Sequence, residues 1–548
     1  MKNISFKLVF SFLSRLQSLS SARLEAAFFL ILYLVGCIFV PSYGIGWDEY
    51  GGRAHGTYNV VGIFRFIAPS MIPDAYKNFP TLDEWYAYTH GAWFEILLSV
   101  SEVALRLEGL HEIYIMRHFL TFSFCFFGLI NFFYLIKRSF SNSSYAFFAI
   151  LIAISSPRIF ADSFYNNKDT VFMSLIVILM NVFSLYMLRG GYHFLILLAF
   201  VNGLTSSLRI AGLLFSPFIV FGIFYKAFSG RKSPSLMIFR ALKDTFVFLI
   251  ASMSTLILSM PYLWSKPFPR LIKIIRENRN FDWPGFVRFE GSVYSAKDLP
   301  WTYLPKWILI TTPPTILILA SIGLFILSYS TFTTSVITKY DRTFLLLMRI
   351  FSSACIFAIS LAAWSNSTLY GGWRHFYFVY PVIVSLAILG MSALAQTRLR
   401  VLKVLMFLII ASQILNVASW MVRNHPHQNL YFNSIAGLDP AHNWDFDYWG
   451  TANTEVLRWI LREDNQKVFT VSANPENPLG QSEKLLSRSE LERVVFLRGG
   501  LTTKPDYLIE NFIGISTPNV NSYIAGYALV KQFKTDDNVF TNIYRRIN

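Results

Sequence analysis

Charged residues are scarce in this chain of 548 residues. Asp, Glu, Lys and Arg together make up 15% of it, whereas a soluble globular protein carries about a quarter. Hydrophobic residues make up 54%, and they gather in repeated apolar runs. This composition excludes an ordinary soluble enzyme and predicts a polytopic membrane protein.

Residues that build disulfides or metal sites are also few. The three cysteines, Cys37, Cys125 and Cys355, all lie inside apolar runs, so the sequence predicts neither a disulfide framework nor a cysteine-based metal site. His425 and His427 are too isolated to predict a metal site. Acidic residues number 32 against 48 Lys and Arg, a formal net charge of +16. Much of that excess falls in short loops between apolar runs, which favours membrane orientation over nucleic-acid binding.

Eleven apolar stretches are long enough, or nearly so, to span a bilayer. They are residues 24–41, 113–136, 145–160, 169–188, 192–209, 210–228, 243–263, 307–328, 343–363, 375–394 and 401–421. The sequence therefore predicts a mainly α polytopic membrane protein of about 11 transmembrane helices. Its N-terminus is expected in the cytoplasm, because that orientation places the basic loops inside. The outward segments are then residues 42–112, 161–168, 261–306, 364–374 and everything after 421.

Helical spacing of apolar residues predicts further helices outside the spans. Residues 94–113 and 270–278 are expected to lie as helices in the outward interface, and residues 4–24 suit a basic amphipathic helix or a disordered tail.

Beyond residue 421 the apolar runs shorten. We predict a transmembrane domain over residues 1–421 and a small outward α/β domain over residues 422–548. Within the second, strands are expected at 467–473 and 506–511, and helices at 454–464 and 489–497. The last stretch predicts a hairpin that turns at Thr535–Asn538.

Two adjacent carboxylates, Asp48 and Glu49, follow the first apolar stretch. An ionised carboxylate at the edge of hydrocarbon costs free energy unless it is solvated or paired. Capping of an interfacial helix is one explanation. Nearby glycines favour the other, a site in which the backbone approaches a ligand closely.

A polar cluster begins at the end of the third apolar stretch and continues beyond it. Its members are Arg158, Asp162, Asn166, Asn167, Lys168 and Asp169. Turn chemistry explains the Asn and Asp residues. It does not explain two basic residues on the outward side, whereas a bound anion does.

Three more outward residues could serve the same anion. Arg209 lies between two apolar stretches, where an arginine either marks function or extends to the headgroups. Arg374 and His375 follow Tyr370 and two glycines. An aromatic belt with an interfacial arginine explains this segment equally well.

The order of these motifs resembles the GT-C glycosyltransferases. The closest resemblance is to the protein O-mannosyltransferase and aminoarabinose transferase group (glycosyltransferase family 39-like). It is carried by Asp48-Glu49 in the first outward loop, SPR at 156–158 before Lys168-Asp169, and the segments GGWRHFYFVYP, HPHQNLYFN and FDYWG. It covers about residues 20–450 and leaves the C-terminal region without a match.

The resemblance implies a polyprenyl-phosphate sugar donor and transfer on the outer face, usually with inversion. Asp48 would be the general base and Glu49 its support. The donor phosphate would be bound by residues drawn from Arg158, Lys168, Arg209, Arg374 and His375. Other substrate contacts would come from Asp162, Asn166, Asn167, Asp169, Tyr370 and Trp373. The resemblance fixes no cofactor, and it leaves a divalent metal open because only some members use one.

The expected partners are therefore the lipid-linked donor, membrane lipids and an acceptor that is a lipid, a glycan or a protein. Bacterial features of the motifs favour the inner membrane, with the C-terminal domain in the periplasm. A lipid-linked glycan polymerase or ligase is an alternative. A non-enzymatic transporter is a second alternative, although the spans are apolar through their centres apart from Asn131, Asn181 and Asn202.

Overall fold

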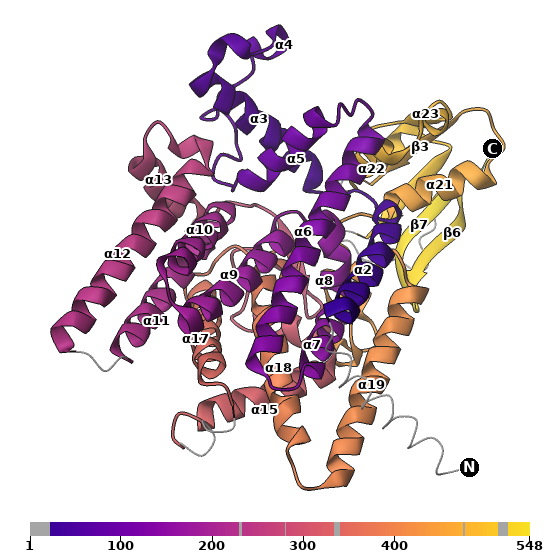
Figure 1. Ribbon diagram of the computed structural model, residues 1–548. Helices are drawn as coiled ribbons and strands as arrows, with labels where there is room; N and C mark the ends of the chain where they lie inside the picture. Colours follow the sequence, from indigo (N-terminus) through magenta and orange to yellow (C-terminus); the bar gives the residue numbers. More distant parts are fainter. Residues whose placement is uncertain are drawn as a thin grey trace.

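A computed structural model describes residues 22–229, 233–279, 281–333, 340–474, 477–512 and 524–547. The surface helix expected over residues 4–24 lies almost wholly outside these ranges. Most of the described residues are helical, as the sequence predicts (Figure 1).

Within the described ranges, eight helical segments are long and apolar enough to cross a membrane. They are α2 (Ala22–Phe39, continued by η1, Val40–Ser42), α6 (Leu110–Ser139), α9 (Asp169–Arg189), η3 (Ile210–Phe215) with α11 (Ser216–Phe228), α12 (Pro234–Leu258), α17 (Arg342–Trp364), η5 (Arg374–Val379) with α18 (Tyr380–Ala395), and α19 (Arg400–Arg423). Two of the other predicted spans form shorter apolar helices, α10 (Tyr192–Leu208) and α15 (Pro314–Tyr329). The predicted span over 307–328 is interrupted because Pro313 and Pro314 follow α14 (Tyr303–Thr311) and a proline disfavours helix in the residue before it.

The predicted span over residues 145–160 is broken near its end. The chain forms α7 (Ser144–Ile154) and then α8 (Pro157–Tyr165), which is bent from α7 by 77°. Pro157 stands at the start of α8, where its missing N–H is tolerated. Arg158 and Asp162 consequently lie on a buried helix instead of a loop.

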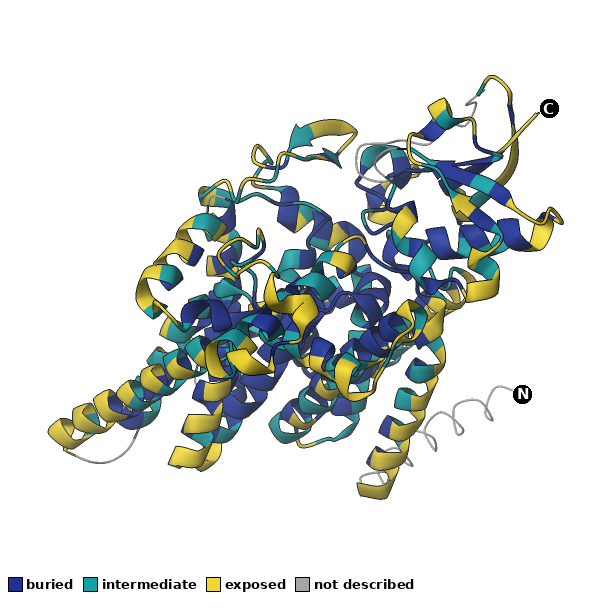
Figure 2. Ribbon diagram, turned by 90° about the horizontal axis from the view of Figure 1, so that it is seen from above, coloured by how far each residue is buried: buried dark blue, intermediate teal, exposed yellow. Residues whose placement is uncertain are grey.

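The helices differ in how much of their surface is covered. In α9 and in the η5–α18 segment, 78% of the most apolar window is buried, against 22% in α2 and 11% in α19. Exposed apolar residues such as Leu30, Ile31 and Ile38 line α2. Figure 2 shows the buried residues gathered in the centre and exposed ones along the projecting helices. In a bilayer, such an apolar exterior faces lipid.

Four helices outside the spans lie toward one end of the bundle, together with the C-terminal sheet (Figure 1). They are α3 (Glu49–Ile67), α4 (Asp74–Lys77), α5 (Trp93–Ala104) and α13 (Pro267–Arg279). The helices predicted over 94–113 and 270–278 correspond to α5, with the start of α6, and to α13. Strands β1 (Phe286–Phe289) and β2 (Ser292–Ser295) form a short antiparallel hairpin after α13.

The C-terminal region contains a five-stranded sheet in the order β4-β3-β5-β7-β6. The strands are β3 (Phe469–Ala473), β4 (Val494–Phe496), β5 (Tyr507–Asn511), β6 (Tyr527–Thr535) and β7 (Asn538–Arg546). The first three pair in parallel and the others antiparallel. Helix α21 (Asn453–Glu463) packs its apolar face against this sheet through Val456, Leu457 and Ile460.

Most of the local predictions in this region are confirmed. Both expected strands, the helix at 454–464 and the hairpin at Thr535–Asn538 are present. The prediction of a helix over 489–497 is wrong. The chain is helical only in α23 (Arg488–Leu491), and β4 follows. Pairing of Val494 and Val495 with β3 outweighs the local helical pattern, as β-branched residues favour strands.

The remaining short helical turns connect these elements. They are η2 (Pro69–Met71), η4 (Pro261–Leu263), η6 (Gln428–Leu430), η7 (Ser434–Ala436), α20 (Pro440–Asn443), α22 (Leu479–Ser482), η8 (Glu483–Leu485) and η9 (Gly500–Thr503).

Candidate active site

Asp48 stands immediately before α3, at the end of the bundle that carries the non-spanning helices. Its side chain is 38% exposed, and one oxygen accepts a hydrogen bond of 2.8 Å from Nη1 of Arg374. Burial alone would raise the pKa of Asp48, but Arg374 and Lys168 outweigh it and hold the pKa well below its usual range. Asp48 is therefore an ionised carboxylate that a substrate can reach.

Arg374 is held in a cage of aromatic rings. Its guanidinium lies 4.5 Å from the ring centre of Trp449, 5.0 Å from that of Tyr370 and 5.9 Å from that of Tyr448. Gly371 has φ of +63°, and a Cβ there would lie 2.9 Å from Nε of Arg374. Glycine is needed at this position both for its backbone angle and for the close approach.

Two more cations belong to this region, because Lys168, Arg209 and Asp48 all lie within electrostatic reach of the His90 ring. Arg209 forms an ion pair with Asp169, whose other oxygen accepts a hydrogen bond of 3.0 Å from Asn166. Lys168 is half-buried, and within the described part of the chain its ammonium has neither an ion pair nor a side-chain hydrogen bond. It lies within electrostatic reach of Asp48. Lys168 is thus the cation of this group that is free to meet an anion.

We call Asp48, Lys168, Asp169, Arg209 and Arg374 the Asp48 cluster. His375 borders it: its ring packs edge-on against Tyr370, with ring centres 4.8 Å apart, and it lies within electrostatic reach of Asp48 and Asp169. The structure thus brings together residues that the sequence separates by more than 300 positions.

Arg158 and Asp162 lie away from this accessible edge. Arg158 is 2% exposed, donates from Nε to the carbonyl of Tyr431 at 2.8 Å, and stacks over Phe432 at 4.4 Å. Asp162 is fully buried and accepts hydrogen bonds from Tyr165 at 2.9 Å and from Trp449 at 3.1 Å. Both residues join α8 to the segment that follows α19.

Trp373 also points inward. It is 2% exposed, and its indole N–H donates to Thr311 at 2.8 Å. Trp373 and Tyr370 were both expected to contact substrate. In the structure Trp373 is anchored to α14, whereas Tyr370 covers the Arg374 guanidinium.

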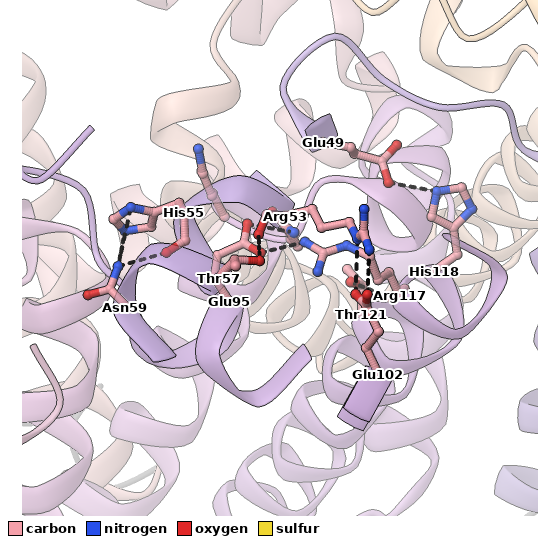
Figure 3. A network of polar contacts seen from close by, with 12 residues as sticks. Glu49, Arg53, His55, Thr57, Asn59, Glu95, Glu102, Arg117, His118 and Thr121 are labelled. Carbon is pink, nitrogen blue, oxygen red and sulfur yellow. Dashed lines mark hydrogen bonds and ion pairs between the residues drawn. The ribbon is translucent and has the colours of Figure 1, made fainter. Parts of the chain in front are cut away.

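Glu49 has a different environment from its neighbour Asp48. It is 3% exposed, accepts 2.6 Å from the backbone N–H of Gly46, and lies 2.8 Å from Nε2 of His118 on α6 (Figure 3). Both of its oxygens are therefore occupied by protein groups.

The same interior holds a second buried carboxylate, Glu95 on α5. Glu95 forms an ion pair with Arg117 and accepts a hydrogen bond of 2.9 Å from the side chain of Asn167. We call Glu49, Glu95, Arg117, His118 and Asn167 the buried network (Figure 3 shows its α3, α5 and α6 members). The sequence analysis overlooked Glu95, Arg117 and His118, although an Arg-His pair inside the apolar stretch 113–136 is an unusual feature that marks function or a paired partner.

A histidine on α3 was also missed. Trp85 donates its indole N–H to Nδ1 of His55 at 2.9 Å, and the opposite ring nitrogen of His55 faces the carbonyl of His90 at 3.2 Å. Burial, aided by the charge of Lys168, lowers the pKa of His55 to about 4. A neutral His55 therefore fastens the segment from Trp85 to His90 to α3, beside Asp48.

Among the described residues, no group of three or more His, Cys, Asp or Glu side chains is arranged to hold a metal ion. The groups gathered around Asp48 are mainly cationic. They suit a bound anion better than a cation.

No protein-family model and no curated protein matches the sequence. Among solved structures, the chain is similar to ArnT from Cupriavidus metallidurans bound to undecaprenyl phosphate, with a TM-score of 0.48 and 11% identity over 96% of this chain and 99% of that one. It is also similar to the archaeal oligosaccharyltransferase AglB from Archaeoglobus fulgidus in complex with an inhibitory peptide and a dolichol-phosphate, with a TM-score of 0.46 and 12% identity over 89% of this chain and 70% of that one. Both are GT-C glycosyltransferases, the superfamily that the motifs of this chain resemble.

Proposed function

We propose that this protein transfers a monosaccharide from a polyprenyl-phosphate donor to an acceptor hydroxyl, with inversion and with Asp48 as the general base. The observation that carries the proposal is an ionised, accessible carboxylate surrounded by cations, one of which, Lys168, has no ion pair with any described residue. A carboxylate can take a proton from a hydroxyl, and the cations can hold a phosphate.

The chemistry uses each charge of the Asp48 cluster. Asp48 takes the proton of the acceptor hydroxyl as its oxygen attacks the anomeric carbon. The bond from that carbon to the phosphate oxygen breaks, and the phosphate leaves with the electron pair. Attack opposite the leaving group inverts the anomeric centre. No general acid is needed, because Lys168, Arg209 and Arg374 stabilise the charge that develops on the phosphate.

The geometry refines the roles expected from the sequence. Lys168 is our first choice for direct phosphate contact, with Arg209, Arg374 and His375 around it. Asn166 and Asp169 orient Arg209. Asp162 and Glu49 are better suited to holding the site together, because their carboxylates are buried and accept hydrogen bonds from protein groups. Arg158 is buried as well and is fixed through Nε, whereas its Nη1 and Nη2 have no hydrogen-bond partner among the described residues.

An apolar cavity supports a lipid-linked substrate. The pocket holds about 850 Å³ of empty space, its open mouth included, and is lined by side chains of α2, α6, α7, α8, α9 and α18. It lies against the face of α8 that carries Phe160 and Phe164. An apolar pocket of this kind accommodates hydrocarbon. We propose that it takes part of an isoprenoid or acyl chain.

We place the Asp48 cluster on the periplasmic side of a bacterial inner membrane, with the region after residue 421 as an outward domain. The distribution of basic loops supports this orientation.

The test is a transfer assay with purified full-length protein, radiolabelled polyprenyl-phosphate monosaccharides and candidate acceptors, with product stereochemistry read by NMR. We expect transfer with inversion by the wild type. Replacement of Asp48 by Asn should reduce turnover by about 10²- to 10⁴-fold while binding of the lipid phosphate persists. Near wild-type turnover in that variant would refute Asp48 as the base.

The same assay separates the alternatives. A polymerase or ligase would transfer a preassembled glycan instead of a single sugar. A transporter would use polar groups in mid-membrane, but the asparagines there bind one another or neighbouring residues: Asn181 donates to Asn131 at 2.8 Å, and Asn202 to Ser216 at 2.9 Å.

A further inference from the structure

Glu95 lies where three parts of the active site meet. It is 2% exposed and belongs to the first turn of α5. Around it are α3, which begins directly after Asp48, α6, which carries Arg117, and the turn between α8 and α9, which carries Lys168. None of these contacts is visible in the sequence pattern of α5.

One oxygen of Glu95 faces both halves of the site. Oε1 accepts the 2.9 Å hydrogen bond from Asn167, the residue before Lys168. A Cβ on Gly52 would lie only 2.3 Å from the same Oε1. The backbone N–H of Gly52 in turn donates to the carbonyl of Asp48 at 2.9 Å. Glu95 therefore touches the first turn of α3 on one side and holds the turn before Lys168 on the other.

The other oxygen is held in place by Arg117. This ion pair is buried, with both side chains at most 2% exposed, and Nε and Nη1 of Arg117 have no partner among the described residues (Figure 3). Buried ion pairs seldom stabilise a protein more than an apolar pair of the same volume would. A role in stability alone therefore explains Glu95 poorly.

We propose that Glu95 is a positioning residue that sets the separation between the base, Asp48, and the phosphate-binding ammonium of Lys168, acting through the Asn167 side chain. This inference rests on the proposed function. Glu95 fixes the turn that carries Lys168 relative to α3, and Arg117 serves only to compensate the charge of Glu95.

If Glu95 acts by accepting from Asn167, and Arg117 only compensates its charge, two double variants should differ in their affinity for lipid phosphate. E95Q/R117Q keeps an oxygen that accepts from Asn167, so affinity for lipid phosphate should stay within about twofold of wild type. E95L/R117M removes the acceptor and leaves no orphan charge, so affinity should fall by about fivefold, as in N167L.

The experiment measures binding of undecaprenyl phosphate, without any sugar, to the full-length protein by isothermal titration calorimetry. Every variant is first compared with wild type by thermal unfolding. K168Q sets the loss expected when the ammonium is absent. In the K168Q background, N167L and E95L/R117M should cause no further loss, because their effect passes through Lys168.

A matched control lies on the same two helices. Arg53 of α3 and Glu102 of α5 form an ion pair, and neither side chain has a hydrogen bond or an ion pair with the described residues 166–169. The variant R53M/E102L should leave lipid-phosphate affinity unchanged, even if it lowers the unfolding temperature.

The outcomes separate this inference from the proposed function. If wild type binds and K168Q weakens binding, but E95L/R117M binds like wild type or its loss adds fully to that of K168Q, Glu95 is merely structural and the inference fails. If wild type does not bind the lipid phosphate, or K168Q binds it equally well, the proposed phosphate site fails and the inference falls with it.

Discussion

Asp48 and Glu49 are adjacent in the chain, yet they belong to two regions with opposite electrostatic designs. In the Asp48 cluster, cations surround an accessible carboxylate, and the Lys168 ammonium has no partner among the described residues. In the buried network, each carboxylate oxygen of Glu49 and Glu95 has a protein partner. Unused charge at an accessible edge is what a ligand can bind, whereas satisfied charge in the interior fixes structure. The comparison thus assigns chemistry to the first region and support to the second.

The largest effect should come from Arg374, the group that keeps Asp48 ionised. In R374M, burial of Asp48 is opposed only by more distant cations, so the pKa of Asp48 should rise. We expect turnover to fall by about 100-fold at neutral pH. The acid limb of the pH–rate profile should move upward, because a raised pKa protonates the base at higher pH.

R374K is the matched control, since it retains the charge and should retain the position of the acid limb. An unchanged limb in R374M would mean that Arg374 does not set the protonation of the base.

Lys168 should show the next largest effect. K168Q should weaken binding of undecaprenyl phosphate by about tenfold, because one charge-assisted contact is lost. Its thermal unfolding should stay close to that of wild type, since no described residue forms a hydrogen bond or an ion pair with the ammonium. A large loss of stability with unchanged affinity would show that Lys168 supports the structure, as the buried network does, and does not bind the phosphate.

Glu49 should affect stability more than transfer. E49Q keeps an acceptor for the Gly46 N–H but removes the charge that faces His118, so we expect destabilisation of about 1–3 kcal/mol. Turnover at a temperature where the variant is folded should fall only a few-fold. A loss of turnover as large as that of Asp48→Asn would break the contrast between the two acids.

Replacement of His55 by Gln should change only how the stability of the protein depends on pH. The unfolded chain protonates this histidine near pH 6.5, but burial delays protonation in the folded state to about pH 4. Between these values the unfolded state binds more protons, so stability falls as the pH drops. In H55Q this part of the loss should disappear, which unfolding temperatures measured from pH 7 to pH 4 would reveal. Equal pH dependence in both proteins would show that His55 is not buried in its neutral form.

Much of the fold is predictable from the sequence because it depends on patterns within single segments. Apolar runs mark the helices, and alternating residues mark β3, β5 and the final hairpin. The bend at Pro157 and the strand at Val494 were missed, since the first depends on how α8 packs beneath the site and the second on pairing with β3.

The sequence by itself determined the chemical types at the site: a pair of acids, a set of cations and glycines that permit close approach. Only the tertiary structure decided which charges are used up within the protein. Arg209 meets Asp169, Arg374 meets Asp48, and Glu49 meets His118 across 40, 326 and 69 positions. The physical reason is that a charge acquires its role from the partner that packing brings within a few ångströms, and no local pattern encodes that distance.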